Sequence, residues 1–158
     1  LLKALNRPLI STGRLVFVTG KGVLWQVREP FPARLLIKSN FLTRWNDQGD
    51  AQNISLDQTP VFQALSHVFL ALFSGKTEKL RDIFDVEIQS GQSAWRLTLV
   101  PKTKVIAAIM GRIHASGSRF VEDIFIEENR GDRTSIRFED IESDTCTLGN
   151  AEKGYFAQ

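Results

Sequence analysis

Two apolar runs separated by a glycine-containing loop predict a β-hairpin near the start of the chain. The runs are Leu15–Val18 and Val23–Val27, and the loop between them contains Gly20, Lys21 and Gly22. Runs rich in Val, Phe and Trp on either side of such a loop are typical of paired antiparallel strands. Because side chains alternate along a strand, the second run has one apolar and one mixed face. The first run is apolar on both faces, so we expect it to lie well inside a sheet.

Further apolar runs predict that strands continue through most of the chain. Pro30 and Pro32 end the hairpin, because proline interrupts the hydrogen-bonded ladder. Ala51–Leu56 is polar enough to lie near a sheet edge, and Asn129–Arg133 has the composition of a hairpin loop. The strands predicted after the hairpin are Ala33–Ser39, Phe41–Asn46, Ala51–Leu56, Phe84–Ser90, Ala94–Val100, Arg112–Ala115, Arg119–Glu128 and Thr134–Ile141.

One strongly apolar helix is predicted over Asp57–Gly75. Thr59 is the expected N-cap, and Pro60 takes the first helical position, where its missing N–H is not needed. Gly75 suits the C-terminal cap. The apolar segment is too short to cross a bilayer, so it should lie against a sheet. Its apolar side chains at helical spacing include Phe62, Leu65, Phe69, Leu72 and Phe73, and its polar face carries Gln63, Ser66 and His67.

The two remaining segments carry weaker patterns. Lys104–Ile109 fits either a short helical turn or a loop. Asp144–Phe156 is predicted to be irregular, with Tyr155 and Phe156 docking the terminus. Strands therefore dominate, and successive antiparallel strands in this number twist strongly. The predicted fold is α+β: a strongly twisted antiparallel sheet forming an unclosed half-barrel, with a helical lid on its concave face.

The hairpin resembles that of the LolA family, the periplasmic carriers of bacterial lipoproteins. The family pattern is a Gly-x-Leu opening, a short turn, an aromatic or aliphatic run ending in Trp, and a later Pro. Gly13, Leu15, Trp25 and Pro30 occupy these positions without a gap. Thr19-Gly20 stands where the best-known carriers have an Arg-Pro pair implicated in cargo handover, which indicates a divergent branch.

Two further segments are similar to the same family. The Thr59-Pro60 start of the predicted helix resembles the family's lid helix, and Trp95–Lys102 follows a Trp-x-Leu-x-Leu-x-Pro-Lys pattern. The resemblance covers the chain from Gly13 to about Phe138. The family's usual N-terminal helix is expected to be absent or reduced to Leu1–Asn6. A cleaved signal peptide would explain why the chain begins without Met.

By periodicity alone, the apolar stripes of these strands and of the helix are ordinary core packing. The resemblance implies instead that they line a cavity for acyl chains. In a closed, empty state, Phe62, Leu65 and Phe69 would pack on Trp25 and Trp95. The cavity residues that it implies are Leu15, Phe17, Val23, Trp25, Leu35, Ile37, Phe62, Leu65, Phe69, Leu72, Trp95, Leu97 and Leu99.

Composition adds limits to this interpretation. The 158 residues fit a single domain, and 42% hydrophobic with 24% charged residues are ordinary values for a globular protein. A formal charge of +2, with no cluster of cations among aromatics, argues against a nucleic-acid partner. Eleven Phe residues against one Tyr indicate much apolar surface to bury. The lone Cys146 excludes an internal disulfide and a Cys-rich metal site.

Known catalytic patterns are not found. His67 and His114 have no second His or Cys at metal-ligand spacing, so no metal site is predicted. Ser74-Gly75-Lys76-Thr77 is similar to the end of a phosphate-binding loop. However, Leu70 stands where the leading Gly should be, and the loop should follow a strand rather than a helix. The acidic residues from Glu122 to Asp144 are typical of a solvated face. We therefore expect no catalytic residues, no cofactor and no enzyme.

Three hypotheses follow. The first is a monomeric carrier in the periplasm of a Gram-negative bacterium. It would pass an acylated lipoprotein from an inner-membrane donor complex towards an outer-membrane acceptor, or carry another lipid cargo such as a glycolipid or lipidated pigment. The second is a sensor or interaction domain with the same fold. The third is a hydrolase of an acylated substrate, which would require Ser and His near the cavity mouth and should lose activity when His67 and His114 are replaced by Ala.

Overall fold

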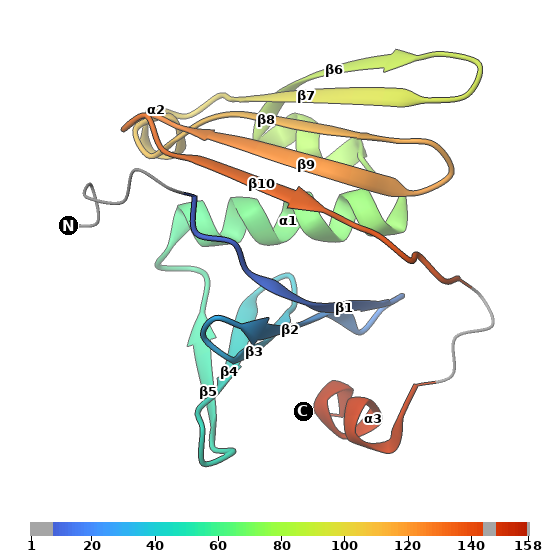
Figure 1. Cartoon of the computed structure of the whole chain (residues 1–158). Helices are drawn as coiled ribbons and strands as arrows, with labels where there is room; N and C mark the ends of the chain where they lie inside the picture. Colours follow the sequence, from blue (N-terminus) through green and yellow to red (C-terminus); the bar gives the residue numbers. More distant parts are fainter. Residues whose placement is uncertain (1–7, 144–147, 158) are drawn as a thin grey trace.

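The computed structural model describes residues 8–143 and 148–157. Within these residues, ten strands form two five-stranded antiparallel sheets, with a long helix between them (Figure 1). The strands run β1-β2-β3-β4-β5 in the first sheet and β10-β9-β8-β7-β6 in the second. The expected α+β half-barrel, open rather than closed, is confirmed. Its strands divide between two hydrogen-bonded sheets rather than forming one, and the segment Leu1–Asn6 lies outside the described residues.

The first sheet comprises β1 (Thr12–Val18), β2 (Gly22–Glu29), β3 (Ala33–Ile37), β4 (Phe41–Trp45) and β5 (Ala51–Ser55). The predicted hairpin is confirmed, because Leu15 pairs with Trp25 and Phe17 pairs with Val23. The edge position of β5 is also confirmed. The expectation that the first run lies well inside the sheet is wrong, because β1 is the opposite edge strand. Its two apolar faces are covered by helices, one on each side, and not by neighbouring strands.

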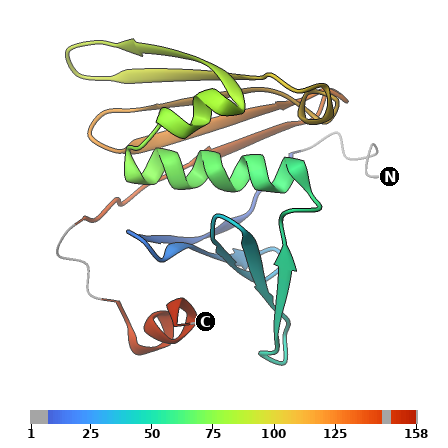
Figure 2. The same ribbon diagram turned by 180° about the vertical axis from the view of Figure 1, so that it is seen from behind.

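Helix α1 (Pro60–Ser74) begins and ends where the sequence predicts. Thr59 is the N-cap residue, although its hydroxyl donates back to the Leu56 carbonyl at 3.4 Å and does not cap the helix. Gly75 ends the helix with φ of 72°, a left-handed conformation that glycine adopts without a steric penalty. Figure 2 shows α1 running across the gap between the two sheets.

The second sheet comprises β6 (Phe84–Ser90), β7 (Trp95–Pro101), β8 (Met110–Gly117), β9 (Val121–Glu128) and β10 (Arg133–Arg137). A short 3₁₀ helix, η1 (Glu78–Asp82), connects α1 to β6 and was not predicted. The Lys104–Ile109 segment contains a single helical turn, α2 (Lys104–Ala107), in which the Thr103 hydroxyl accepts a bond from the Ile106 N–H.

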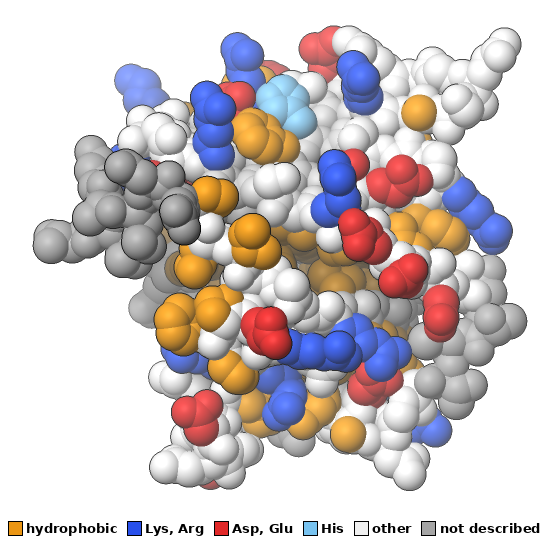
Figure 3. All heavy atoms as spheres, viewed as in Figure 1, with side chains coloured by type: hydrophobic (Ala, Val, Ile, Leu, Met, Phe, Trp, Pro, Cys, Tyr) orange, Lys and Arg blue, Asp and Glu red, His pale blue; other side chains and the backbone are white. Residues whose placement is uncertain are grey.

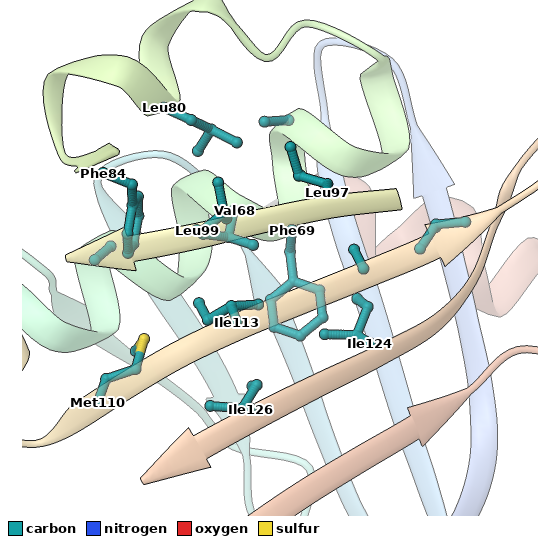
Figure 4. Packing of buried hydrophobic residues seen from close by; sticks show 14 of the residues in the cluster. Val68, Phe69, Leu80, Phe84, Leu97, Leu99, Met110, Ile113, Ile124 and Ile126 are labelled. Carbon is teal, nitrogen blue, oxygen red and sulfur yellow. The ribbon is translucent and has the colours of Figure 1, made fainter. Parts of the chain in front are cut away.

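The main core fills the space between α1 and the second sheet. Ala64, Val68 and Ala71 present one side of α1 to this core. The core side chains on the sheet alternate along each strand, as Figure 4 shows for Leu97, Leu99, Ile113, Ile124 and Ile126. Leu99 and Ile113 are fully buried. The helix is thus fixed to the second sheet by close packing.

A second, smaller core lies on the opposite face of the first sheet. Helix α3 (Asn150–Phe156) lies there, although the sequence pattern predicted an irregular segment. Phe156 is buried against the face that carries Val16, Leu24 and Leu36, and the docking predicted for Phe156 is confirmed. The ring of Tyr155 meets that of Trp45 edge to face at 5.0 Å.

Candidate apolar cleft

A chain of aromatic contacts joins the first sheet to α1. Trp25 of β2 meets Phe69 of α1 edge to face, with ring centroids 5.5 Å apart. Phe69 stacks on Phe73 at 6.3 Å, and Phe73 stacks on Phe17 of β1 at 6.0 Å. Phe73 also meets Phe138, just beyond β10, edge to face at 5.4 Å. Phe73 of α1 therefore contacts residues at the facing edges of both sheets.

The strand register places the predicted apolar residues of the first sheet on a single face. Leu15, Trp25 and Leu35 lie side by side across β1, β2 and β3. Phe17, Val23 and Ile37 form the next row. Directly paired residues of antiparallel strands point to the same side of a sheet. Since Trp25 and Phe17 contact α1, this whole face is turned towards the helix.

Burial differs between the two sides of α1. The second-sheet residues Leu97 and Leu99 are buried core. Leu15, Phe17, Trp25 and Leu35 on the first-sheet face remain only half-buried. Leu65, Leu72 and Phe73 of α1 are also half-buried, and these three and Trp25 pack against the main core as well. Figure 3 shows apolar side chains recessed between the two halves of the molecule, at the gap between β1 and β10. We call this recess the apolar cleft: α1 forms its floor, and the β1–β3 face forms one wall.

A charged pair lies at the β10 edge of the second sheet, next to Phe138. The Arg137 Nε donates to a carboxylate oxygen of Asp123 at 2.9 Å. This hydrogen bond, together with the negative charge of Asp123, raises the pKa of Arg137, which keeps its charge. Glu122, Asp123, Arg137 and Phe138 line a shallow hollow beside this pair. The aromatic ring of Phe138 thus lies between this charged pair and the apolar cleft.

Most of the predicted cavity residues lie around α1. Some face the cleft, and others belong to the main core. Val23, Ile37 and Phe69 are buried, and Trp95 is half-buried against the main core. Leu97 and Leu99 belong to that core, and so they lie on the filled side of α1. The expectation that Phe62 packs on the tryptophans is wrong, because its side chain is 57% exposed at the start of α1.

Two residues beside the cleft were not among the predicted cavity residues. Phe73 belongs to the predicted helical stripe, and its contacts with three other phenylalanines make it central to the cleft. Phe138 lies beyond β10 and packs against the core. The alternation Ile136-x-Phe138 was an available signal. This alternation could not place Phe138 beside the cleft, because the sequence does not show that β10 lies opposite β1.

The two histidines lie on different elements, His67 on α1 and His114 on β8. His114 is on the outer face of the second sheet, where its Nδ1 is 3.2 Å from the Thr98 hydroxyl and its Nε2 is 3.9 Å from Glu127. Both ring contacts point away from α1, because His114 alternates with the core residues Ile113 and Ala115. In the part of the chain that the structure describes, no group of three or more His, Cys, Asp or Glu residues is arranged to hold a metal ion.

The family comparison agrees with this geometry. The model of the family described as "Outer membrane lipoprotein carrier protein LolA" matches residues 3–147. The chain belongs to the LolA family. No curated protein matches the sequence. Helix α3 lies beyond the matched residues, so its packing on the first sheet is a feature of this chain outside the family match. Among the helices of residues 8–143 and 148–157, none is long and apolar enough to cross a membrane.

Thr19-Gly20, compared above with an Arg-Pro pair, lies in the turn between β1 and β2. Gly20 has φ of 75°, and the Lys21 N–H donates to the Val18 carbonyl at 2.9 Å. Proline is held near φ of about −65° and cannot adopt this conformation. The turn therefore has a shape that excludes proline at position 20.

Proposed function

We propose that this LolA-family protein is a periplasmic carrier that holds acyl chains of a lipoprotein or related amphiphile in the apolar cleft. The observation that carries the proposal is the row of half-buried apolar side chains on the β1–β3 face, opposite the aromatic residues of α1. On the other side of α1, Leu97 and Leu99 of the second sheet are buried in the main core. Acyl chains would therefore enter on the first-sheet side.

Transfer energies support a carrier that can also release its cargo. Burial of an acyl chain yields about 0.8 kcal/mol for each CH₂, or on the order of 10 kcal/mol for one long chain fully shielded. In the empty state, contacts such as Trp25–Phe69 and Phe17–Phe73 fill part of the cleft. Cargo must displace these contacts, which lowers the net affinity. Cargo could then pass to an acceptor that buries the chain more fully, without a cofactor in this protein.

The experiment is titration of a fluorescent fatty acid into the protein and two matched variants. Leu35→Asn places a polar group on the cleft face, and we expect it to weaken binding about tenfold, because the amide must be desolvated. Val100→Asn makes a comparable change at an exposed position on the outer face of the second sheet and should bind as the parent protein does. Equal affinities for the parent and Leu35→Asn would contradict the proposal.

The nature of the cargo is addressed by mass spectrometry of lipids extracted from natively purified protein. A lipoprotein cargo would appear as acylated peptide, and a glycolipid or lipidated pigment by its own mass. A sensor with the same fold would bind the fluorescent probe equally well. It would differ from a carrier in failing to deliver an acylated peptide to acceptor vesicles.

A further inference from the structure

The cleft is closed at one end of α1 and open at the other. Phe62, Phe69 and Phe73 share one face of the helix, because they are seven and four residues apart. At the C-terminal end, Phe73 is covered by Phe17 and Phe138. At the N-terminal end, Phe62 is 57% exposed. The aromatic face of α1 therefore continues from the covered end of the cleft out to solvent.

Exposed apolar side chains gather at this open end. Helix α2 packs against α1, and Figures 1 and 2 both place it beside the first turns of α1. Val105 and Ile109 project from this segment, 60% and 55% exposed. Leu9 and Ile10 lead into the start of β1, which lies at the same end, and are 64% and 75% exposed. Two separate segments and Phe62 thus present large apolar side chains at the same end.

The same end carries positive charge. Lys102 and Lys104 flank the start of α2, and Arg112 lies near the start of β8 at the same end. The β9–β10 loop is attached to this segment, because the Asn129 N–H donates to the Ile109 carbonyl at 3.2 Å. That loop adds Arg130 and contains one acid, Asp132. Lys104 and Arg130 therefore lie in the two segments that meet at the exposed aliphatic side chains, while Lys102 is paired with Asp85 at 4.0 Å.

We propose that this α2 end docks on a bilayer surface that carries anionic lipid headgroups. Aliphatic side chains would enter the headgroup region, while Lys104 and Arg130 contact lipid phosphates. The open end of the cleft would then face the membrane from which an acyl chain is withdrawn or into which it is released. This inference rests on the proposed function only for that last step, because docking itself requires no cargo.

The test is co-sedimentation with vesicles of phosphatidylcholine alone or of phosphatidylcholine mixed with phosphatidylglycerol. We expect binding to the mixed vesicles, weakened about fivefold by each of Lys104→Gln and Arg130→Gln, as surface cations near anionic lipid typically contribute. Lys21→Gln and Lys76→Gln are matched controls, because both lie in loops at the covered end of the cleft, and they should bind as the parent does. Val105→Ser with Ile109→Ser should also weaken binding, whereas exposed Ile88→Ser should not.

Each outcome decides the matter. Absence of the parent from the mixed-vesicle pellet would overturn the inference, as would equal losses for the α2-end and control variants. In that case a protein would be the better candidate for the surface. The fluorescent fatty acid is titrated on the same samples. Fatty-acid binding without vesicle binding overturns only the docking surface, and vesicle binding without fatty-acid binding overturns only the proposed function.

Discussion

The indole of Trp25 on β2 meets the ring of Phe69 on α1 edge to face, with centroids 5.5 Å apart. Phe69 also belongs to the main core between α1 and the second sheet. Together with the Phe17–Phe73 contact, this pair therefore connects the first sheet to a helix that is packed on the second. We therefore expect the strength of this contact to affect how easily the first sheet separates from α1.

A double-mutant cycle measures that contact. Trp25→Ala and Phe69→Ala should each lower the free energy of unfolding, and the coupling between them should be about 0.5–1.5 kcal/mol, as expected for an aromatic pair. Urea denaturation of the parent, both single variants and the double variant gives the value. Coupling indistinguishable from zero would mean that the sheet and the helix are not held by this contact.

Phe73 should act as the closure of the cleft. Phe73→Ala removes the contacts to Phe17 and Phe138, so the fluorescent fatty acid should associate roughly tenfold faster as the closed form loses about 1–2 kcal/mol. Stopped-flow fluorescence measures the rate. Phe125→Ala, on the outer face of the second sheet beside His114, is the matched control and should leave the rate unchanged. Similar rates for all three proteins would contradict closure by Phe73.

Leu99 and Leu35 should separate stability from binding. Leu99 is fully buried in the main core, so Leu99→Ala should lower the free energy of unfolding by about 2–5 kcal/mol. Leu35 is half-buried in the cleft wall, so Leu35→Ala should have a smaller effect on stability and a larger one on fatty-acid affinity. Thermal unfolding and probe titration of both variants provide the comparison. The opposite ranking would show that Leu99 lines the binding site.

Helix α3 should stabilise the first sheet without taking part in binding. Arg14 forms an ion pair of 3.1 Å with Glu152, a carboxylate that is only 7% exposed and also accepts the Gly149 N–H. Arg14→Ala leaves this buried charge short of a partner, so we expect a loss of about 1–3 kcal/mol in unfolding free energy. Arg28→Ala, at an exposed position on β2, is the control. A loss of fatty-acid affinity in Arg14→Ala would contradict the claim that the α3 face of the first sheet takes no part in binding at the α1 face.

Much of the fold was predictable because its signals are local. The hairpin turn, the alternation of Trp25 and its neighbours, and the two ends of α1 at Thr59 and Gly75 each depend on a few adjacent residues. The predicted position of β1 was wrong because apolar faces show that both sides of a strand are covered, and not whether a second strand pairs with its other edge. Helix α3 was missed because Gly154 weakens its helical pattern, and it is held by contacts with distant residues such as Trp45.

The sequence predicted which faces of the strands and of the helix are apolar. It did not predict where a cleft lies between them. Alternation placed Leu97 and Leu35 on faces directed towards the helix, and both do face it. The sequence could not indicate which side of α1 is filled, because that depends on how two sheets of similar pattern pack against one helix. Phe138 was missed for the same reason, since its contact with Phe73 joins residues far apart in the sequence.

Quenching of single tryptophans by a brominated fatty acid tests the central claim most directly. Trp25 lies in the cleft, whereas Trp45 is buried beneath α3 on the opposite face of the first sheet. One variant keeps only Trp25, through Trp45→Phe and Trp95→Phe, and the other keeps only Trp45. If acyl chains occupy the cleft, the brominated chain quenches Trp25 strongly and leaves Trp45 fluorescent. Equal quenching of both, or quenching of Trp45 alone, would contradict the account.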